Sequence, residues 1–176
     1  YDAIKVDAPV GSLYVLFNGD YVGGIVSQNS MRDMYMVALK YLGYSINTEN
    51  EAENREAQDL LVKQKPDGQA YLVDEARDEV VAGNATMAVV YSGEAYLGNQ
   101  YNEDLAYVIP KEGSNVWLDS WCVTKNCDNV DAAQQFLDFL CREDVAKINF
   151  EYIYYSTPND AVVESLSDEE RADEAW

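Results

Sequence analysis

Two hydrophobic periods alternate along most of this chain, and together they predict a regular succession of strands and helices. Continuous apolar runs predict strands, because a strand that is buried on both faces carries apolar residues at every position. Apolar runs, some of them with polar residues among the apolar ones, lie at residues 24–28, 71–73, 86–91, 105–109 and 116–124 and are the predicted strands.

Apolar residues at helical spacing fill most of the segments between these runs. Met34, Val37 and Tyr41 recur at intervals of three and four, which predicts a helix over residues 31–42. Gly43 suits the end of that helix, because glycine readily adopts the left-handed conformation found there. Further helices are predicted at 51–65 (stopped by Pro66), 74–82 (capped by Asp74), 94–98, 130–141 and 143–151. This alternation is typical of a three-layer αβα domain.

The chain ends differ from this alternating region. Pro9 and several glycines interrupt residues 1–24, which predicts a connecting segment with at most one strand. The predicted α/β lobe then covers residues 25–166. Acids dominate residues 167–176, which are predicted to form an acidic C-terminal tail.

Composition excludes several functions. The chain has 32 acidic and 12 basic residues among 176, no histidine, and a net charge of −20. This charge argues against nucleic acid and anionic membrane surfaces as partners, since both are bound by basic patches. Without histidine, Ser-His-Asp, Cys-His and His-metal chemistry is excluded, and the three cysteines lack the paired spacing of a zinc site. The sequence predicts no catalytic residue, no metal site, no cofactor and no direct membrane insertion of this chain.

Polar residues follow two of the predicted strands at the edge where α/β sheets bind ligands, beyond the carboxyl ends of the strands. The first strand leads to Ser30 and Asp33, and the strand at 86–91 leads to Tyr91 and Glu94. Asp33 is also in the first turn of a predicted helix, where any acid is favoured by the helix dipole. Acids and an aromatic ring therefore form the candidate ligand-binding set at this edge.

A second candidate set lies on the predicted strand at 116–124. Residues two apart share one face of a strand, so Trp117, Asp119 and Trp121 are expected to point the same way. A carboxylate between aromatic faces suits an organic cation. The alternative is a tryptophan-rich core strand whose Asp119 caps a turn, and Trp121 by itself is expected in the core. Tyr155, just before the turn at Pro158, adds another ring.

Several short motifs occur in order over residues 25–166. They are QNSMRD at 28–33, ALKYLGYS at 38–45, YSGEA at 91–95, YVIPKEG at 107–113 leading into WLDS at 117–120, FLCREDVA at 139–146 and YSTPN at 155–159. In these motifs the chain resembles the spermidine/putrescine-binding proteins of polyamine ABC transporters. The resemblance implies a lobe of a type II periplasmic-binding-protein-like fold, the second and inserted lobe of a two-lobed protein, and it implies that the first lobe is absent here.

The resemblance also implies roles for residues at matching positions. Asp119 would hold an amine, and Trp117 would stack on the methylene chain. Asp33 would hold another amine, Tyr91 would stand where some members have tryptophan, and Tyr155 would close the pocket. Ser30 and Glu94 complete the expected ligand-binding residues. At Asn29-Ser30 the chain departs from the family, whose members usually carry at least one aspartate there.

The implied partners are a polyamine and, through the full-length protein, an ABC permease. The implied location is extracytoplasmic, in the periplasm or at the cell surface, with a lipid anchor as one option for the full-length protein. Residues 1–24 resemble the family only through LFNGDY at 16–21, and residues 1–12 are expected to be a foreign addition.

Other functions remain open at this point. Asp33, Glu94 or Asp119 could supply the carboxylate pair of a hydrolase, which needs the two groups about 5 to 10 Å apart. A lobe that binds another small cationic or polar solute is a second alternative. A sensory domain with the same fold is a third, although a fused signalling segment is absent from this sequence.

Overall fold

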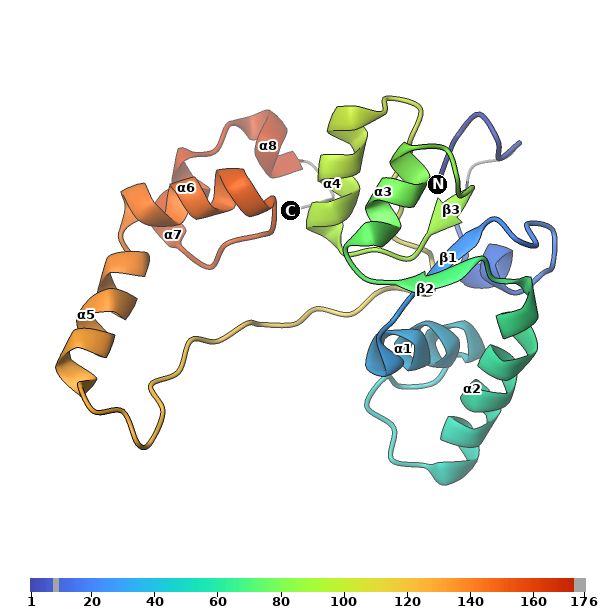
Figure 1. Cartoon of the computed structure of the whole chain (residues 1–176), viewed down its shortest axis with the longest axis horizontal. Coiled ribbons are helices and arrows are strands. Elements are labelled where there is room, and N and C mark those ends of the chain that lie inside the picture. The colour runs from blue at the N-terminus through green and yellow to red at the C-terminus, as the bar shows by residue number, and fades with distance from the viewer. Residues whose placement is uncertain (8–9, 173–176) are drawn as a thin grey trace. The chain divides into compact units, whose positions relative to one another are not determined.

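A computed structural model describes residues 1–7 and 10–172 of the chain. The chain forms two compact units, Tyr1–Val116 and Trp117–Trp176 (Figure 1). The predicted lobe at residues 25–166 spans parts of both, and its boundaries remain a prediction.

A small parallel sheet forms the centre of the first unit. Its strands are β1 (Ile25–Gln28), β2 (Ala70–Leu72) and β3 (Met87–Ala88), in the order β2-β1-β3. Val26 of β1 lies level with Ala70 on one side and Ala88 on the other. Strands that run parallel need crossover connections, and here helices provide them.

Helices cover both faces of this sheet (Figure 1). One face carries α1 (Met31–Leu42) and α2 (Glu51–Gln64), and the other carries α3 (Glu75–Val81) and α4 (Ser92–Tyr101). A short 3-10 helix, η2 (Lys65–Asp67), follows α2.

Neighbouring residues of β1 pack on opposite faces of the sheet. Ile25 contacts the cluster that contains Val37 of α1, and Val26 contacts Val80 of α3. This alternation is expected of a strand with both faces covered. The three-layer α/β prediction is therefore confirmed.

Helix α1 has the predicted bounds, and local signals account for both ends. The Ser30 hydroxyl accepts a hydrogen bond from the backbone N–H of Asp33, which caps the N-terminus. Gly43 adopts φ 81° at the C-terminus, and its N–H bonds the carbonyls of Leu39 and Lys40.

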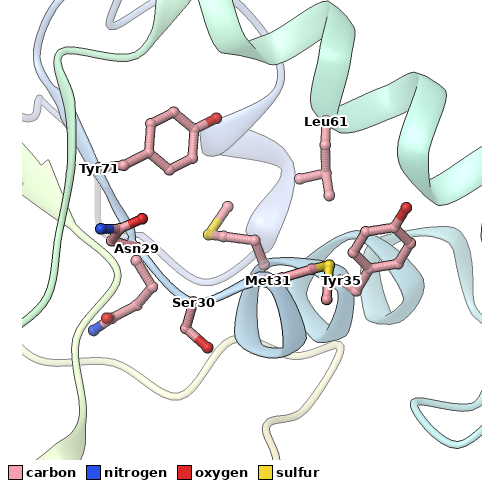
Figure 2. A pocket seen from close by; sticks show the side chains of 8 residues that line it. Asn29, Ser30, Met31, Tyr35, Leu61 and Tyr71 are labelled. Carbon is pink, nitrogen blue, oxygen red and sulfur yellow. The ribbon is translucent and has the colours of Figure 1, made fainter.

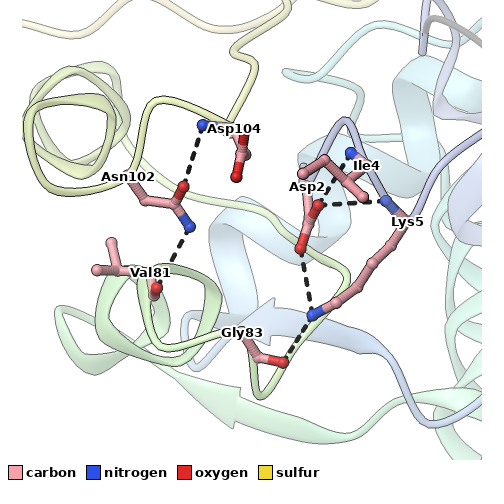
Figure 3. Close-up of polar contacts among 7 residues, drawn as sticks. All are labelled: Asp2, Ile4, Lys5, Val81, Gly83, Asn102 and Asp104. Carbon is pink, nitrogen blue, oxygen red and sulfur yellow. Dashed lines mark hydrogen bonds and ion pairs between the residues drawn. The ribbon is translucent and has the colours of Figure 1, made fainter.

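The N-terminal segment contributes to the first unit through both main-chain and side-chain bonds. The Asp2 N–H donates to the Thr86 carbonyl at 2.8 Å. Figure 3 shows the Asp2 carboxylate accepting from the N–H groups of Ile4 and Lys5, while Lys5 Nζ lies 3.2 Å from that carboxylate and donates to the Gly83 carbonyl. Burial acts to raise the pKa of Asp2, but these hydrogen bonds outweigh it, and the pKa falls below its usual value.

The second unit is helical in its described part. It contains α5 (Val130–Leu140), α6 (Glu143–Ile153), α7 (Asp160–Ser165) and α8 (Asp168–Ala172). Phe150, Val162 and Leu166 form its buried cluster. Helix α8 falls within the predicted acidic tail, whose residues 173–176 lie outside the described residues.

Several sequence predictions are corrected. The segment at 116–124 forms no strand, and the strand predicted at 105–109 is reduced to an isolated antiparallel bridge between Leu105 and Asp2. An apolar run becomes a strand only where a neighbour completes the hydrogen-bond ladder. For the same reason the run at 86–91 yields only the two residues of β3.

The described N-terminal segment contains no named strand, and one capping prediction is corrected. The only regular element in the described part of residues 1–24 is a 3-10 helix, η1 (Leu13–Leu16), begun by the Ser12 hydroxyl, which accepts from the Tyr14 N–H. Asp74 precedes α3 but makes no side-chain capping bond, since its backbone is already helical. Within the described residues, no helix is long and apolar enough to cross a membrane.

Candidate functional site

Asp33 and Tyr91 meet at the predicted ligand edge of the first unit. Asp33 lies in the first turn of α1, which follows β1, and Tyr91 immediately precedes α4, which follows β3. The Tyr91 hydroxyl donates a 2.9 Å hydrogen bond to Oδ2 of Asp33. Both side chains are half-buried. The parallel arrangement of β1 and β3 brings the two residues together, because both strands end at the same edge.

The Asp33 carboxylate has no basic partner within the described part of the chain. The ion pairs there involve other acids: Asp2, Asp78, Glu94, Asp144 and Glu151. A half-buried carboxylate with one hydroxyl donor and no counter-charge can accept further hydrogen bonds from a cation. The Asp33 carboxylate is therefore suited to bind an amine.

Glu94, another predicted ligand residue, already holds a cation. Nη1 of Arg77, on α3, donates to its carboxylate at 2.9 Å, and Arg77 also pairs with Asp78. Burial raises the pKa of Glu94, and the charge of Arg77 only partly offsets this rise. The pair joins α3 to α4, and Glu94 holds its own cation before any ligand is present. Arg77 was not predictable as a partner of Glu94, since nothing in the spacing of the two residues signals their contact.

In the second unit the structure brings together Trp117 and Tyr155. Their ring centroids lie 6.5 Å apart with an interplanar angle of 69°, an edge-to-face arrangement. Trp117 is 42% exposed, and Asp119 is exposed. Trp121 is 75% exposed, so its expected place in the core of this chain is wrong. Without a strand at 116–124, no sheet face exists there to bury it.

A pocket of about 270 Å³ lies in the first unit between α1, α2 and the sheet. Figure 2 shows the side chains of Met31, Tyr35, Leu61 and Tyr71 around it. Ser30, the cap of α1, also lines this pocket. Ser30, one of the predicted ligand-binding residues, therefore both caps α1 and lines the pocket. The pocket was not predictable from the sequence, because it depends on how α2 packs against α1.

The arrangement suits binding. Among the described residues, no group of three or more Asp, Glu or Cys side chains is placed to hold a metal ion. The functional groups at the ligand edge are a carboxylate, a phenol and an ion pair, which can select a ligand by charge and shape.

Comparisons with known proteins agree with a role in binding a small molecule. The profile of the family described as "Bacterial extracellular solute-binding protein" matches residues 3–175. The spermidine/putrescine-binding periplasmic protein of Escherichia coli (strain K12) is 33% identical over 154 residues, which cover 88% of this chain and 44% of that protein. The chain spans about half the length of the curated relatives it matches.

Solved structures share the fold. The substrate-binding protein PotD of a spermidine/putrescine ABC transporter from Streptococcus pneumoniae strain Canada MDR_19A has a TM-score of 0.83 and 33% identity, covering 99% of this chain and 54% of its own. A Listeria monocytogenes protein assigned to a spermidine/putrescine ABC transporter has a TM-score of 0.86 and 39% identity, covering 93% and 51%. The fold is that of the periplasmic binding proteins, and the chain belongs to the family of bacterial extracellular solute-binding proteins.

Proposed function

We propose that this chain binds polyamines of the spermidine and putrescine class as part of the solute-binding component of an ABC importer. The hydrogen bond between Tyr91 and Asp33 is the observation that carries the proposal. It holds a carboxylate that lacks a basic partner among the described residues at the ligand edge of the sheet. The names of the relatives and of the solved structures point to the same ligand class.

The geometry suits a primary ammonium. An ammonium has three hydrogen-bond donors, and the two oxygens of a carboxylate can accept several hydrogen bonds. With Oδ2 of Asp33 already accepting from Tyr91, the ammonium adds charge-assisted bonds to the same carboxylate. The adjacent Tyr91 ring favours a cation near its face. Asp33 therefore supplies the counter-charge, and Tyr91 orients it.

Glu94 has a different role in this proposal. Because Arg77 already neutralises it, an amine would have to displace an internal guanidinium. We assign Glu94 to fixing α4 against α3, which positions Tyr91 just before α4.

The second unit offers its own ligand groups. Trp117 and Tyr155 form an edge-to-face pair, and flat rings of this kind cover methylenes between amines. Asp119, two residues from Trp117, supplies a carboxylate. Because Asp119 is exposed, solvent screens any ion pair it makes.

The remaining parts of the proposal follow from the family. The protein acts outside the cytoplasm, in the periplasm or at the cell surface, and delivers its ligand to a membrane permease. It releases the ligand unchanged, so it is a binding protein rather than a hydrolase.

Calorimetric titration with spermidine tests the proposal. Asp33→Asn should weaken binding by about tenfold or more, because a hydrogen bond to a charged group is worth about 1.5–3 kcal/mol. Asp59→Asn, which removes an exposed acid from α2, controls for the overall loss of charge and should change the affinity by less than about twofold. Equal affinities for wild type and Asp33→Asn would refute the assignment.

A further inference from the structure

The pocket between α1 and α2 lies at the same end of α1 as Asp33, the residue proposed to bind an amine, but has the opposite character. Its side walls are apolar or aromatic, formed by Met31, Tyr35, Leu61 and Tyr71 (Figure 2). Its volume of about 270 Å³ has room for a small organic group.

Among the described residues, those that line this pocket carry no charged side chain. An ammonium placed inside would meet no counter-charge among the lining side chains, so any hydration it lost there would not be compensated. The pocket therefore discriminates against the free amino end of a polyamine. An uncharged end of a ligand, by contrast, is stabilised by contact with the aromatic rings and with the flexible thioether of Met31.

The pocket also has polar groups next to its apolar walls. Gln28, Asn29 and Ser30 line it, and an amide or a hydroxyl can hydrogen-bond an uncharged carbonyl or N–H group. Ser30 links the pocket to the proposed amine site, since its hydroxyl accepts from the N–H of Asp33. Asp33 and the pocket therefore lie at the same N-terminal end of α1, and the pocket favours a neutral, partly polar group.

We propose that this pocket receives the uncharged, acylated end of a monoacylated diamine, whose free ammonium lies at Asp33. The amide of the ligand meets Asn29 and Ser30, and the acyl methyl group lies among Met31 and Tyr71. This inference rests on the proposed function, because it uses Asp33 as the amine ligand, and it extends the ligand class to polyamines with one blocked end.

Calorimetry with N-acetylputrescine and putrescine tests this inference on the full chain. Met31→Trp places a large ring at an exposed position on the pocket wall, and Tyr71→Ala removes a ring from it. Each variant should lower the ratio of the affinity for N-acetylputrescine to that for putrescine by about fivefold or more. Val62→Trp adds the same ring to an exposed position of α2 that does not line the pocket, and should leave the ratio within about twofold. Circular dichroism spectra confirm that each variant is folded.

Asp33→Asn separates this inference from the proposed function. It should weaken both ligands together. If it weakens neither, the amine site at Asp33 is wrong. If it weakens both while Met31→Trp and Tyr71→Ala leave the ratio unchanged, the pocket inference is overturned and the amine site stands. Failure of the wild type to bind N-acetylputrescine at about 10 mM would also overturn the pocket inference.

Discussion

Tyr91 and Asp33 lie 58 residues apart in the sequence, and a 2.9 Å hydrogen bond joins the tyrosine hydroxyl to the aspartate carboxylate. The bond connects the start of α4 to the first turn of α1 across the edge of the parallel sheet. It therefore fixes the direction of a carboxylate that has no basic partner in the described residues.

Replacing Tyr91 by phenylalanine tests the orienting role of the hydroxyl. Tyr91→Phe keeps the ring but removes the donor, and a single hydrogen bond of this kind is worth about 0.5–1.5 kcal/mol. We expect the affinity for spermidine, measured by calorimetry, to fall by about two- to tenfold. Tyr91→Ala should cost more, since it also removes the ring. If Tyr91→Phe bound as tightly as wild type, the hydroxyl would have no part in the site.

Trp117 provides a test of aromatic cover in the second unit. Trp117→Ala should weaken polyamine binding by about 1–2 kcal/mol, and Trp117→Phe should recover part of this loss because a ring face remains. Trp121→Ala is the matched control, since Trp121 is more exposed and has no assigned contact. A loss of thermal stability without a loss of affinity would instead make Trp117 a structural residue.

The buried amide of Gln28 predicts a stabilising substitution. Gln28 is 2% exposed at the end of β1, and neither of its amide atoms has a hydrogen-bond partner in the described part of the structure. Unpaired buried polar groups cost about 1–3 kcal/mol. Gln28→Leu should therefore raise the free energy of unfolding by about 1 kcal/mol in urea denaturation. Gln58→Leu, at an exposed position of α2, should change it little, and equal effects of the two substitutions would contradict the account.

Asp2 predicts a pH dependence of stability. Its pKa is lower in the folded protein than its ordinary value, so the ionised carboxylate stabilises the fold above the unfolded pKa of about 3.9. This contribution disappears as the pH falls through the folded pKa. The stability advantage of wild type over Asp2→Asn should therefore be largest near neutral pH and shrink below about pH 4. Denaturation curves at several pH values would show it, and a constant difference would contradict the assignment.

Local signals account for what the sequence predicted well. The bounds of α1 were predictable because Ser30 caps one end and Gly43 ends the other, and both act within a few residues. The meeting of Asp33 and Tyr91 at one edge of the sheet was predictable because each follows a strand of a parallel sheet, and their ligand-binding role stays a prediction.

Contacts between distant segments account for what the sequence did not predict. A strand at residues 116–124 would need a hydrogen-bonding neighbour, which an apolar run does not reveal by itself. The pairing of Arg77 with Glu94 depends on the packing of α3 beside α4. The pocket at Leu61 and Tyr71 likewise depends on where α2 lies against α1 and β2.

Chemical-shift mapping by NMR tests the central claim most directly, because it shows which residues meet the ligand. Spermidine added to the isotope-labelled chain should shift the signals of Ser30, Asp33 and Tyr91 in a saturable way, and Mg²⁺ at matched ionic strength should not reproduce this pattern. Small, uniform shifts spread over exposed acids such as Asp59, alike for spermidine and Mg²⁺, would show only diffuse attraction to a chain of net charge −20 and would contradict the account.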